Sequence, residues 1–332
     1  MNVLIIGGTV FLGRHLVDAA LAAGHDVTLA NRGQSNADLF PDLPRIIFDR
    51  RSDDMSPLAS GSWDAVIDTC GYVPAHVKAT AEALADRAGH YTFVSSVSAY
   101  ADASKPGLDE TAPVGQLDDP ETTEVTGETY GALKAACEAA AAAVFGERCL
   151  NVRPGLIAGP WDPSDRFTYW PRRFDAGGEA LVPAAPELPV QLADVRDLAE
   201  WMIRAAAAGE SGLFNACGPQ KPWTLGEVLD ACRVAAGAGA AEAVPVDEDF
   251  LVEQVGPWIE LPLWVPKGSG TDGLFAVNVD KAVAAGMTFR PLQTLVEDTL
   301  EWDRARRDQP LRGPLTAEKE AAVLAAWREK NR

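Results

Sequence analysis

The chain lacks the patterns that would place it in a membrane or on a nucleic acid. No apolar run reaches the ~18 residues of a membrane-spanning helix, and the opening segment MNVLIIGG has neither the basic region nor the cleavage site of a signal peptide. Positive charge is scarce, because 29 Lys and Arg stand against 48 Asp and Glu, for a formal net charge of −19. Such a surface repels phosphate backbones and anionic membranes. We therefore expect neither nucleic acid nor membrane as a partner.

Disulfide and metal-binding patterns are also missing. The cysteines are scattered with no CxxC spacing, and the four histidines are scattered too. An odd, unpatterned set of cysteines in a long chain favours reduced thiols in a cytoplasm over a disulfide framework or a zinc site. We therefore expect a cytoplasmic protein without a metal centre. The cysteines are Cys70, Cys137, Cys149, Cys217 and Cys232.

The first half of the chain contains short apolar segments of strand type that alternate with segments of helix type. With 332 residues, 47% of them hydrophobic, the chain can bury a core in one large or two interleaved domains. This alternation is typical of an α/β fold with a parallel sheet. We predict strands at 2–6, 26–30, 46–48, 65–69 and 91–96, and helices from 11 to about 24, at 74–87 and at 130–145.

A glycine turn follows the first strand, in the segment GGTVFLG. Gly7, Gly8 and Gly13 permit a tight turn and close packing of strand on helix, and the helix that follows offers unpaired N–H groups to a pyrophosphate. Val10 stands where a dinucleotide-binding fingerprint has its middle glycine, so a glycine turn without a nucleotide is the alternative. The predicted cofactor contacts of this turn are Gly7, Thr9, Val10, Phe11, Leu12 and Gly13.

The end of the second strand favours NADP over NAD. An acidic residue there binds the ribose hydroxyls of NAD, whereas Asn31 has no carboxylate and Arg32 can pair with a 2′-phosphate. Alternatively, Arg32 stacks on adenine or faces solvent, so NAD(H) stays open. At later strand ends, Asp49 would accept from the adenine amino group. Further predicted cofactor contacts at these ends are Arg50, Cys70 and Gly71.

Three side chains further along suggest proton transfer. Tyr130 and Lys134 lie one turn apart on a predicted helix and therefore share a face. A free phenol has a pKa near ~10, and a neighbouring ammonium favours the phenolate. Ser96 ends a buried strand at the edge where parallel sheets bind ligands. The alternatives are a solvated Tyr–Lys pair and a serine that serves only the turn.

In this order, the glycine turn, Ser96, Tyr130 and Lys134 resemble the short-chain dehydrogenase/reductase superfamily, in its extended branch with the NAD-dependent epimerases and dehydratases. The GGTVFLG form is similar to an atypical subgroup of that branch, and the resemblance continues through 152–155, 194–199 and 214–219. It implies a Rossmann-type doubly wound parallel sheet in residues 1–155, completed by later segments. Residues 156–332 would form a smaller, interleaved substrate region with the C-terminal helices.

The same resemblance implies roles for single residues. Tyr130 would be the acid/base, and Lys134 would lower the pKa of Tyr130 and hold the nicotinamide ribose. Ser96 would polarise the substrate oxygen. Pro154 and Gly155 would lie beside the nicotinamide, and Ile157 would be a further cofactor contact.

The residues at two positions argue against a sugar-nucleotide substrate. Relatives that bind such substrates often have an Asn where this chain has Leu156, and a diphosphate-binding Arg where it has Val190. Val97 and Ser98 also replace the acidic residues expected of a dehydratase. Charges that could replace the missing ones are those of Arg172, Arg173, Lys221 and Arg290.

The second half of the chain carries aromatic segments. We predict that 161–183 forms a lid over the cofactor, and that Trp258 and Trp264 either line an apolar pocket or pack in the core. A helix at 292–307 precedes a final one at 316–330, which would dock on the body or form a subunit contact, so a homodimer is one interpretation.

Three functions are consistent with the sequence. The first is an NAD(P)-dependent oxidoreductase, with NADP(H) favoured, that acts on a carbonyl or alcohol of a small, fairly apolar molecule. The second is a sugar-nucleotide epimerase or dehydratase with retained NAD. The third is a binding protein that has lost catalysis, as in the chloroplast RNA-binding relatives of the same subgroup; the intact Ser96, Tyr130 and Lys134 argue against it.

Overall fold

A seven-stranded parallel sheet forms one half of the molecule in the computed structural model, which describes residues 1–52 and 54–332. The strand order is β11-β6-β5-β4-β1-β2-β3, so strand addition reverses direction between β1 and β4. Open sheets bind ligands outside the carboxyl ends of the strands at such a reversal. The strands are β1 (Asn2–Ile6), β2 (Asp26–Asn31), β3 (Arg45–Ile47), β4 (Trp63–Asp68), β5 (Ala88–Val94), β6 (Cys149–Pro154) and β11 (Gly212–Ala216).

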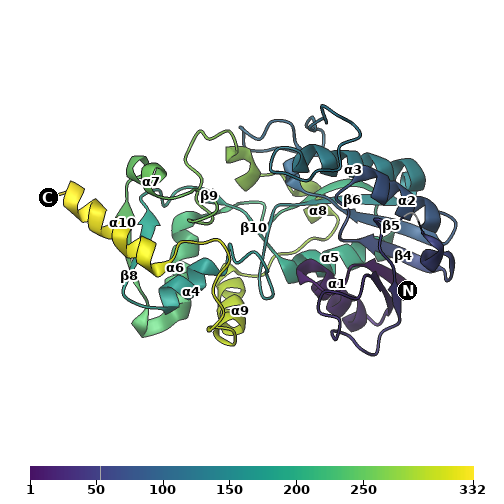
Figure 1. Cartoon of the computed structure of the whole chain (residues 1–332), viewed down its shortest axis with the longest axis horizontal. Coiled ribbons are helices and arrows are strands. Elements are labelled where there is room, and N and C mark those ends of the chain that lie inside the picture. Colours follow the sequence, from purple (N-terminus) through teal and green to yellow (C-terminus); the bar gives the residue numbers. More distant parts are fainter. Residues whose placement is uncertain (53) are drawn as a thin grey trace.

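Helices cover both faces of this sheet (Figure 1). Side chains alternate along a strand, so Val3 and Ile5 of β1 pack on one face and Leu4 and Ile6 on the other. Helices α1 (Phe11–Ala22) and α5 (Val195–Ala208) bury the first face, and α2 (Pro74–Leu84) and α3 (Tyr130–Phe145) bury the second. A strand that is buried on both faces has a continuous apolar sequence, as VLII does.

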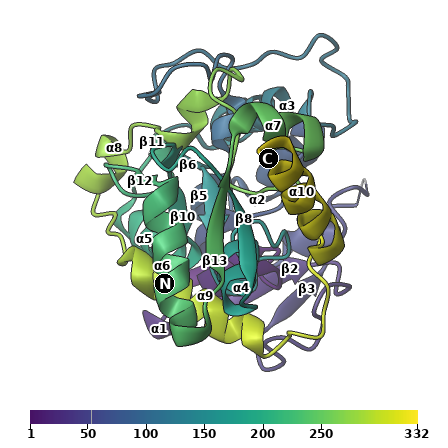
Figure 2. The same cartoon turned by 90° about the vertical axis from the view of Figure 1, so that its left-hand side faces the viewer.

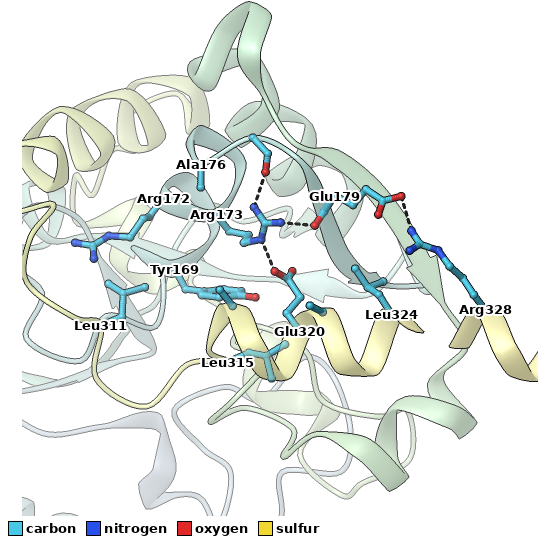
Figure 3. Close-up of a pocket in the computed structure, with 13 residues that line it drawn as sticks. Tyr169, Arg172, Arg173, Ala176, Glu179, Leu311, Leu315, Glu320, Leu324 and Arg328 are labelled. Carbon is cyan, nitrogen blue, oxygen red and sulfur yellow. Dashed lines mark hydrogen bonds and ion pairs between the residues drawn. The ribbon is translucent and has the colours of Figure 1, made fainter. Parts of the chain in front are cut away.

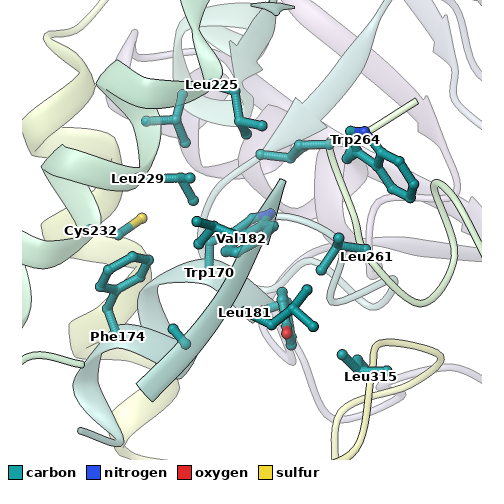
Figure 4. Close-up of a cluster of buried hydrophobic side chains, with 14 of the residues drawn as sticks. Trp170, Phe174, Leu181, Val182, Leu225, Leu229, Cys232, Leu261, Trp264 and Leu315 are labelled. Atoms are coloured by element: carbon teal, nitrogen blue, oxygen red, sulfur yellow. The ribbon is translucent and has the colours of Figure 1, made fainter. Parts of the chain in front are cut away.

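The other half of the molecule is built by the later part of the chain (Figure 2). Helices α4 (Tyr169–Asp175), α6 (Leu225–Ala236), α9 (Leu292–Arg304) and α10 (Ala317–Lys330) surround the parallel pair β8 (Glu179–Pro183) and β13 (Glu242–Val246). Their shared core contains Trp170, Phe174, Leu181 and Trp264 (Figure 4).

Small elements join the two halves. Strand β7 (Leu156–Ala158) pairs with β10 (Leu192–Asp194), and β9 (Pro189–Val190) pairs with β12 (Trp223–Thr224). None of the helices in the described part of the chain is both long and apolar enough to cross a membrane. The remaining helices are α7 (Glu248–Gln254), α8 (Asp280–Ala284) and the 3₁₀ turns Ser56–Ala59, Val97–Ala99, Gly146–Arg148, Gly237–Gly239 and Asp272–Phe275.

The doubly wound parallel fold predicted from the sequence is confirmed, with small differences at strand ends. The fifth strand ends at Val94 instead of residue 96. Ser96 accepts a hydrogen bond from the Ser98 N–H and so caps the 3₁₀ turn that follows, whereas the Ser95 N–H still donates to the Val152 carbonyl of β6 at 2.7 Å.

Most of the aromatic segment 161–183 is core, so the prediction of a lid was wrong for these residues. Phe167, Tyr169, Trp170 and Phe174 are at most 2% exposed and pack between α4, α6 and β8. Trp264 is fully buried in the same core, which settles its alternatives in favour of packing. Trp258, in contrast, is only partly buried.

Candidate functional site

A cavity of about 750 Å³ lies at the carboxyl ends of β1, β2 and β4, where the strand order reverses. Its lining includes these predicted cofactor residues: Gly7, Thr9, Val10, Phe11, Leu12, Gly13, Asn31, Arg32, Asp49, Arg50 and Cys70. The sequence did not single out further residues of the lining, among them Gln34, Ser35, Thr69, Tyr72, His76, Thr123 and Pro163. Outside this lining lie Gly71, Tyr130, Lys134, Pro154 and Ile157.

The glycine turn has a backbone that requires glycine. Gly7 and Gly8 have φ values of +106° and +83°, and a Cβ on Gly13 would lie 2.7 Å from the Gly8 nitrogen. Helix α1 begins directly after this turn, its N-cap Val10 supplies no side-chain acceptor, and its first turn carries no acidic residue. Its first N–H groups are therefore available to an anionic ligand, as a dinucleotide pyrophosphate requires.

The end of β2 carries a cation but no free carboxylate. Asn31 donates to the Gly7 carbonyl at 2.7 Å and accepts from the Gly33 N–H at 2.9 Å, so its amide holds the glycine turn in place. Asp49 pairs with Arg51 at 2.6 Å, which lowers the pKa of Asp49 to about 2. Arg32 is exposed, and no carboxylate among residues 1–52 and 54–332 forms an ion pair with it.

Arg50 lines the cavity as one member of a buried ion pair. It donates to both oxygens of Asp68 at 2.8 and 2.7 Å, and Tyr91 donates to Asp68 at 2.8 Å. Burial alone would raise the pKa of Asp68, but the Arg50 guanidinium outweighs it and the pKa is lowered. Because both terminal nitrogens of Arg50 donate to Asp68, the arginine stabilises the cavity wall. It is therefore less available to bind a ligand phosphate than an unpaired arginine would be.

Lys134 spans the ends of two strands. Its Nζ donates to the carbonyl of Gly71, beyond β4, at 2.8 Å and to that of Val94, the last residue of β5, at 2.6 Å. It also lies 5.1 Å from the ring centre of Tyr72, which lines the cofactor cavity. Burial lowers the pKa of Lys134 to about 8. At neutral pH the side chain is thus a buried ammonium beside the cavity.

Tyr130 begins α3 next to the turn that carries Ser96. A Cβ on Gly131 would lie 2.0 Å from the Ser98 carbonyl oxygen, so this glycine lets the helix start against the turn. The sequence analysis missed Gly131, whose position between Tyr130 and the rest of the helix was the available signal. The Tyr130 ring lies 6.5 Å from that of Tyr72, between ring centres, which brings the tyrosine to the edge of the cavity.

Burial raises the pKa of Tyr130, and the neighbouring Ser96 hydroxyl and Arg166 guanidinium partly oppose that shift. The phenol is therefore protonated at neutral pH. Ser96, Tyr130 and Lys134 are thus gathered at the carboxyl end of β5 and the start of α3, although Arg166 rather than Lys134 is the cation that lowers the Tyr130 pKa here.

The arginines suggested as replacement charges for a diphosphate are engaged elsewhere. Arg172 pairs with the buried Asp303, and Arg290 pairs with Glu200 at 2.6 Å and with Asp197. Arg173 pairs with Glu320 at 2.7 Å. Only Lys221 of the four remains an exposed cation without a recorded carboxylate partner in the described residues.

A second cavity, of about 490 Å³, lies between α4, β8 and α10 (Figure 3). Figure 3 shows the Arg173 guanidinium bound to Glu320 and to backbone carbonyls, so each of its three nitrogens already has an acceptor. Neither Ser96, Tyr130 nor Lys134 lines this cavity. Within the described ranges, no three His, Cys, Asp or Glu side chains gather as they would around a metal ion.

Comparison with known proteins agrees with this geometry. The chain is 27% identical over 270 residues to the chloroplast stem-loop binding protein of 41 kDa b of Arabidopsis thaliana, which covers 75% of this chain and 68% of the relative. The fold matches the UDP-glucose 4-epimerase of Thermus thermophilus in complex with NAD, with a TM-score of 0.63, 21% identity and coverage of 92% of this chain and 99% of that one. It also matches a human epimerase family protein with NADPH, with a TM-score of 0.61, 21% identity and coverage of 91% and 99%.

These structures are similar in fold, and one was determined with NAD and the other with NADPH, which supports a nicotinamide cofactor for the fold. The sequence pattern of one family matches residues 3–217, from the first strand of the sheet to the residue after its last. The chain belongs to the NAD dependent epimerase/dehydratase family.

Proposed function

We propose that this protein is an NAD(P)-dependent oxidoreductase that transfers a hydride to or from a carbonyl or alcohol carbon of a small molecule with an apolar body. The observation that carries this function is the gathering of Ser96, Tyr130 and Lys134 at the edge of the cavity where the sheet reverses. A protonated phenol and a buried ammonium at that place match the needs of carbonyl reduction.

The glycine turn and the start of α1 fit a dinucleotide, since they combine strained glycine conformations with uncapped N–H groups. When bound, the cofactor supplies or accepts the hydride. Tyr130 gives its proton to the carbonyl oxygen as the carbon is reduced, and the Ser96 hydroxyl polarises that oxygen. Lys134, a buried ammonium beside the cavity, orients the cofactor ribose.

NADP(H) is the favoured cofactor. Arg32 is exposed at the cavity and has no recorded carboxylate partner in the described part of the chain, while the nearby Asp49 is neutralised by Arg51. A 2′-phosphate would pair with Arg32, and no free carboxylate at the end of β2 would repel it.

A sugar-nucleotide epimerase with retained NAD is the second candidate, favoured by the family and by the fold shared with the Thermus thermophilus enzyme. Against it stand the apolar Leu156 and Val190 and the ion pairs that engage Arg172, Arg173 and Arg290. A purely binding role, which the name of the chloroplast relative suggests, is disfavoured by the net charge of −19.

A screen of small aldehydes and ketones with NADPH tests the proposal, with loss of NADPH absorbance as the signal. We expect turnover of some apolar carbonyl compounds by the wild type and almost none by Tyr130→Phe. If the wild type reduces none of them but contains NAD that survives purification, the epimerase takes first place.

A further inference from the structure

The segment between β7 and α4, residues 159–168, is anchored to both halves of the molecule. His15 of α1 hydrogen-bonds to the Pro160 carbonyl at 3.1 Å, and the Arg14 guanidinium lies 3.7 Å from the ring centre of Trp161. Trp161 also packs on Trp302 of α9, with ring centres 5.7 Å apart. The segment therefore has a fixed path past the cofactor cavity, to which it contributes Pro163.

The two aspartates of this segment already accept hydrogen bonds from other residues. Asp162 accepts from the Ser164 N–H at 2.8 Å and from the Ser164 hydroxyl at 2.9 Å. Asp165, with a φ of +57°, accepts from the Arg312 N–H at 3.0 Å and pairs with Arg306. Both carboxylates thus hold the backbone that leads into Arg166.

Arg166 is the exception in this network. In the ranges 1–52 and 54–332, no carboxylate or carbonyl accepts a hydrogen bond from its guanidinium. The guanidinium lies 5.1 Å from the ring centre of Trp258 and is close enough to Tyr130 to lower its pKa. Trp258 is itself held at a φ of +65° and packs edge-on against Phe275, with ring centres 5.5 Å apart.

Other arginines of this part of the molecule differ from Arg166 because they have buried carboxylate partners. Arg172, Arg290 and Arg306 all donate to carboxylates that are at most 5% exposed. Arg166 is half-buried, its guanidinium faces the Trp258 ring, and it is close enough to Asp162 to oppose the rise in the pKa of that carboxyl. Because its N–H groups have no acceptor among residues 1–52 and 54–332, they are available to an anionic ligand. Trp258 beside it provides an apolar face for the body of that ligand.

We propose that Arg166 and Trp258 form an anion-binding subsite for the substrate. The substrate would carry a carboxylate or a phosphate, held by Arg166, on an apolar or aromatic body that lies on Trp258. Its carbonyl would then point toward Tyr130. This subsite rests on the hydride-transfer function proposed above, and it narrows that substrate from a neutral apolar molecule to an anionic one.

Binding of simple probes tests the subsite without requiring turnover. Benzoate, phenyl phosphate and the neutral benzamide are titrated by calorimetry into the NADP-saturated wild type, Arg166→Ala, Arg166→Lys and Arg204→Ala. Arg204 is an exposed arginine of α5 that donates to the Gly286 carbonyl, so its variant controls for the loss of one charge.

We expect the wild type and Arg204→Ala to bind one of the anions more tightly than benzamide. Arg166→Ala should bind that anion roughly 10- to 100-fold more weakly, as for the loss of a charged hydrogen bond, with benzamide unchanged. Arg166→Lys should recover part of the loss. Preference for benzoate would identify a carboxylate substrate, and preference for phenyl phosphate a phosphorylated one. Equal binding of all three probes by the wild type, or equal anion affinity in Arg166→Ala, would overturn the subsite.

Turnover separates this subsite from the proposed function. 4-Carboxybenzaldehyde and 4-methylbenzaldehyde are offered with NADPH to the wild type and Arg166→Ala. The subsite predicts that the wild type has the higher kcat/KM for the charged aldehyde and that Arg166→Ala loses this preference. If neither aldehyde is reduced while Arg166-dependent anion binding persists, the reduction chemistry fails and the subsite stands. Reduction of both aldehydes with the same ratio in both proteins would refute the subsite alone.

Discussion

Arg32 of the cofactor half and Arg172 of the substrate half show the two uses that this molecule makes of arginine. Around the cofactor cavity, Arg32 is exposed at the end of β2 and has no recorded carboxylate partner in the described residues. In the other half, Arg172 and Arg173 lie beside buried acidic partners, Asp303 and Glu320. The same residue type therefore serves ligand binding or packing, even within one half, since Arg50 beside the cofactor cavity pairs with the buried Asp68. Only the partners of each arginine reveal which role it has.

This difference also bears on the substrate. Most of the arginines discussed for the substrate half, namely Arg172, Arg173 and Arg290, are paired with carboxylates. To bind a dianionic diphosphate, each guanidinium would first have to leave its carboxylate, which costs free energy. Arg166 and the exposed Lys221 of the substrate half form no ion pair with a carboxylate among residues 1–52 and 54–332. A single anionic group fits Arg166 better than a nucleotide does.

Loss of the Tyr130 hydroxyl should have the largest effect. Tyr130→Phe removes the proton donor and should lower turnover by roughly 10²- to 10⁴-fold. Cofactor affinity should change little, because the hydroxyl does not line the cavity. Stopped-flow and steady-state rates, with NADPH binding measured in parallel, check both parts. Unchanged turnover would remove Tyr130 from the mechanism.

Breaking a charge pair in the substrate half should cost stability. Asp303 is fully buried and receives Arg172 and Arg306, so Asp303→Ala should lower the free energy of unfolding by about 3–5 kcal/mol. The matched control is Asp230→Ala on α6, whose pair with Arg233 is exposed and should contribute about 0–1 kcal/mol. Urea unfolding measures both, and similar losses in the two variants would contradict the distinction between buried and exposed ion pairs.

On the cofactor side, removal of an arginine should cost affinity instead. Arg32→Ala should weaken NADPH roughly 10- to 100-fold, through loss of a charged hydrogen bond, and should leave NADH nearly unchanged. Arg204→Ala is the control, since Arg204 is an exposed arginine of α5 that does not line the cavity. Fluorescence titration with both cofactors gives the answer. Equal losses for NADPH and NADH would refute the 2′-phosphate role.

A pH profile should show the smallest of these effects. The pKa of Lys134 is lowered to about 8, so the ammonium is present below that pH and lost above it. Because the charged form orients the cofactor ribose in the proposed mechanism, kcat/KM for carbonyl reduction should fall as the pH rises through about 8. Lys134→Arg should remove this inflection if the variant remains folded by circular dichroism. A wild-type rate that stays flat to pH 10 would argue that the Lys134 charge is not needed.

The cofactor half was predictable because its signals are local. A glycine turn after an apolar strand requires a particular backbone, and helix periodicity places Tyr130 and Lys134 on one face, so short segments carry the information. The cavity lining accordingly contains eleven of the predicted contacts, from Gly7 to Cys70.

The substrate half was less predictable because its signals depend on distant partners. Nothing local in the sequence distinguishes Arg166, whose guanidinium has no acceptor within the described residues, from Arg172, whose partner Asp303 lies 131 residues away. Likewise Trp258 and Trp264 occur in one Pro-broken segment, yet only Trp264 is buried in the core. Such outcomes are decided by tertiary packing, and periodicity does not report them.

The most direct measurement is cofactor exchange in the purified protein. The protein is denatured and its released nucleotide identified, and a fresh sample is then titrated with NADPH and with NADH. A reductase with Arg32 on the 2′-phosphate should carry little nucleotide through purification and bind NADPH reversibly and much more tightly than NADH. NAD that is retained at one equivalent and does not exchange would contradict the account and favour an epimerase.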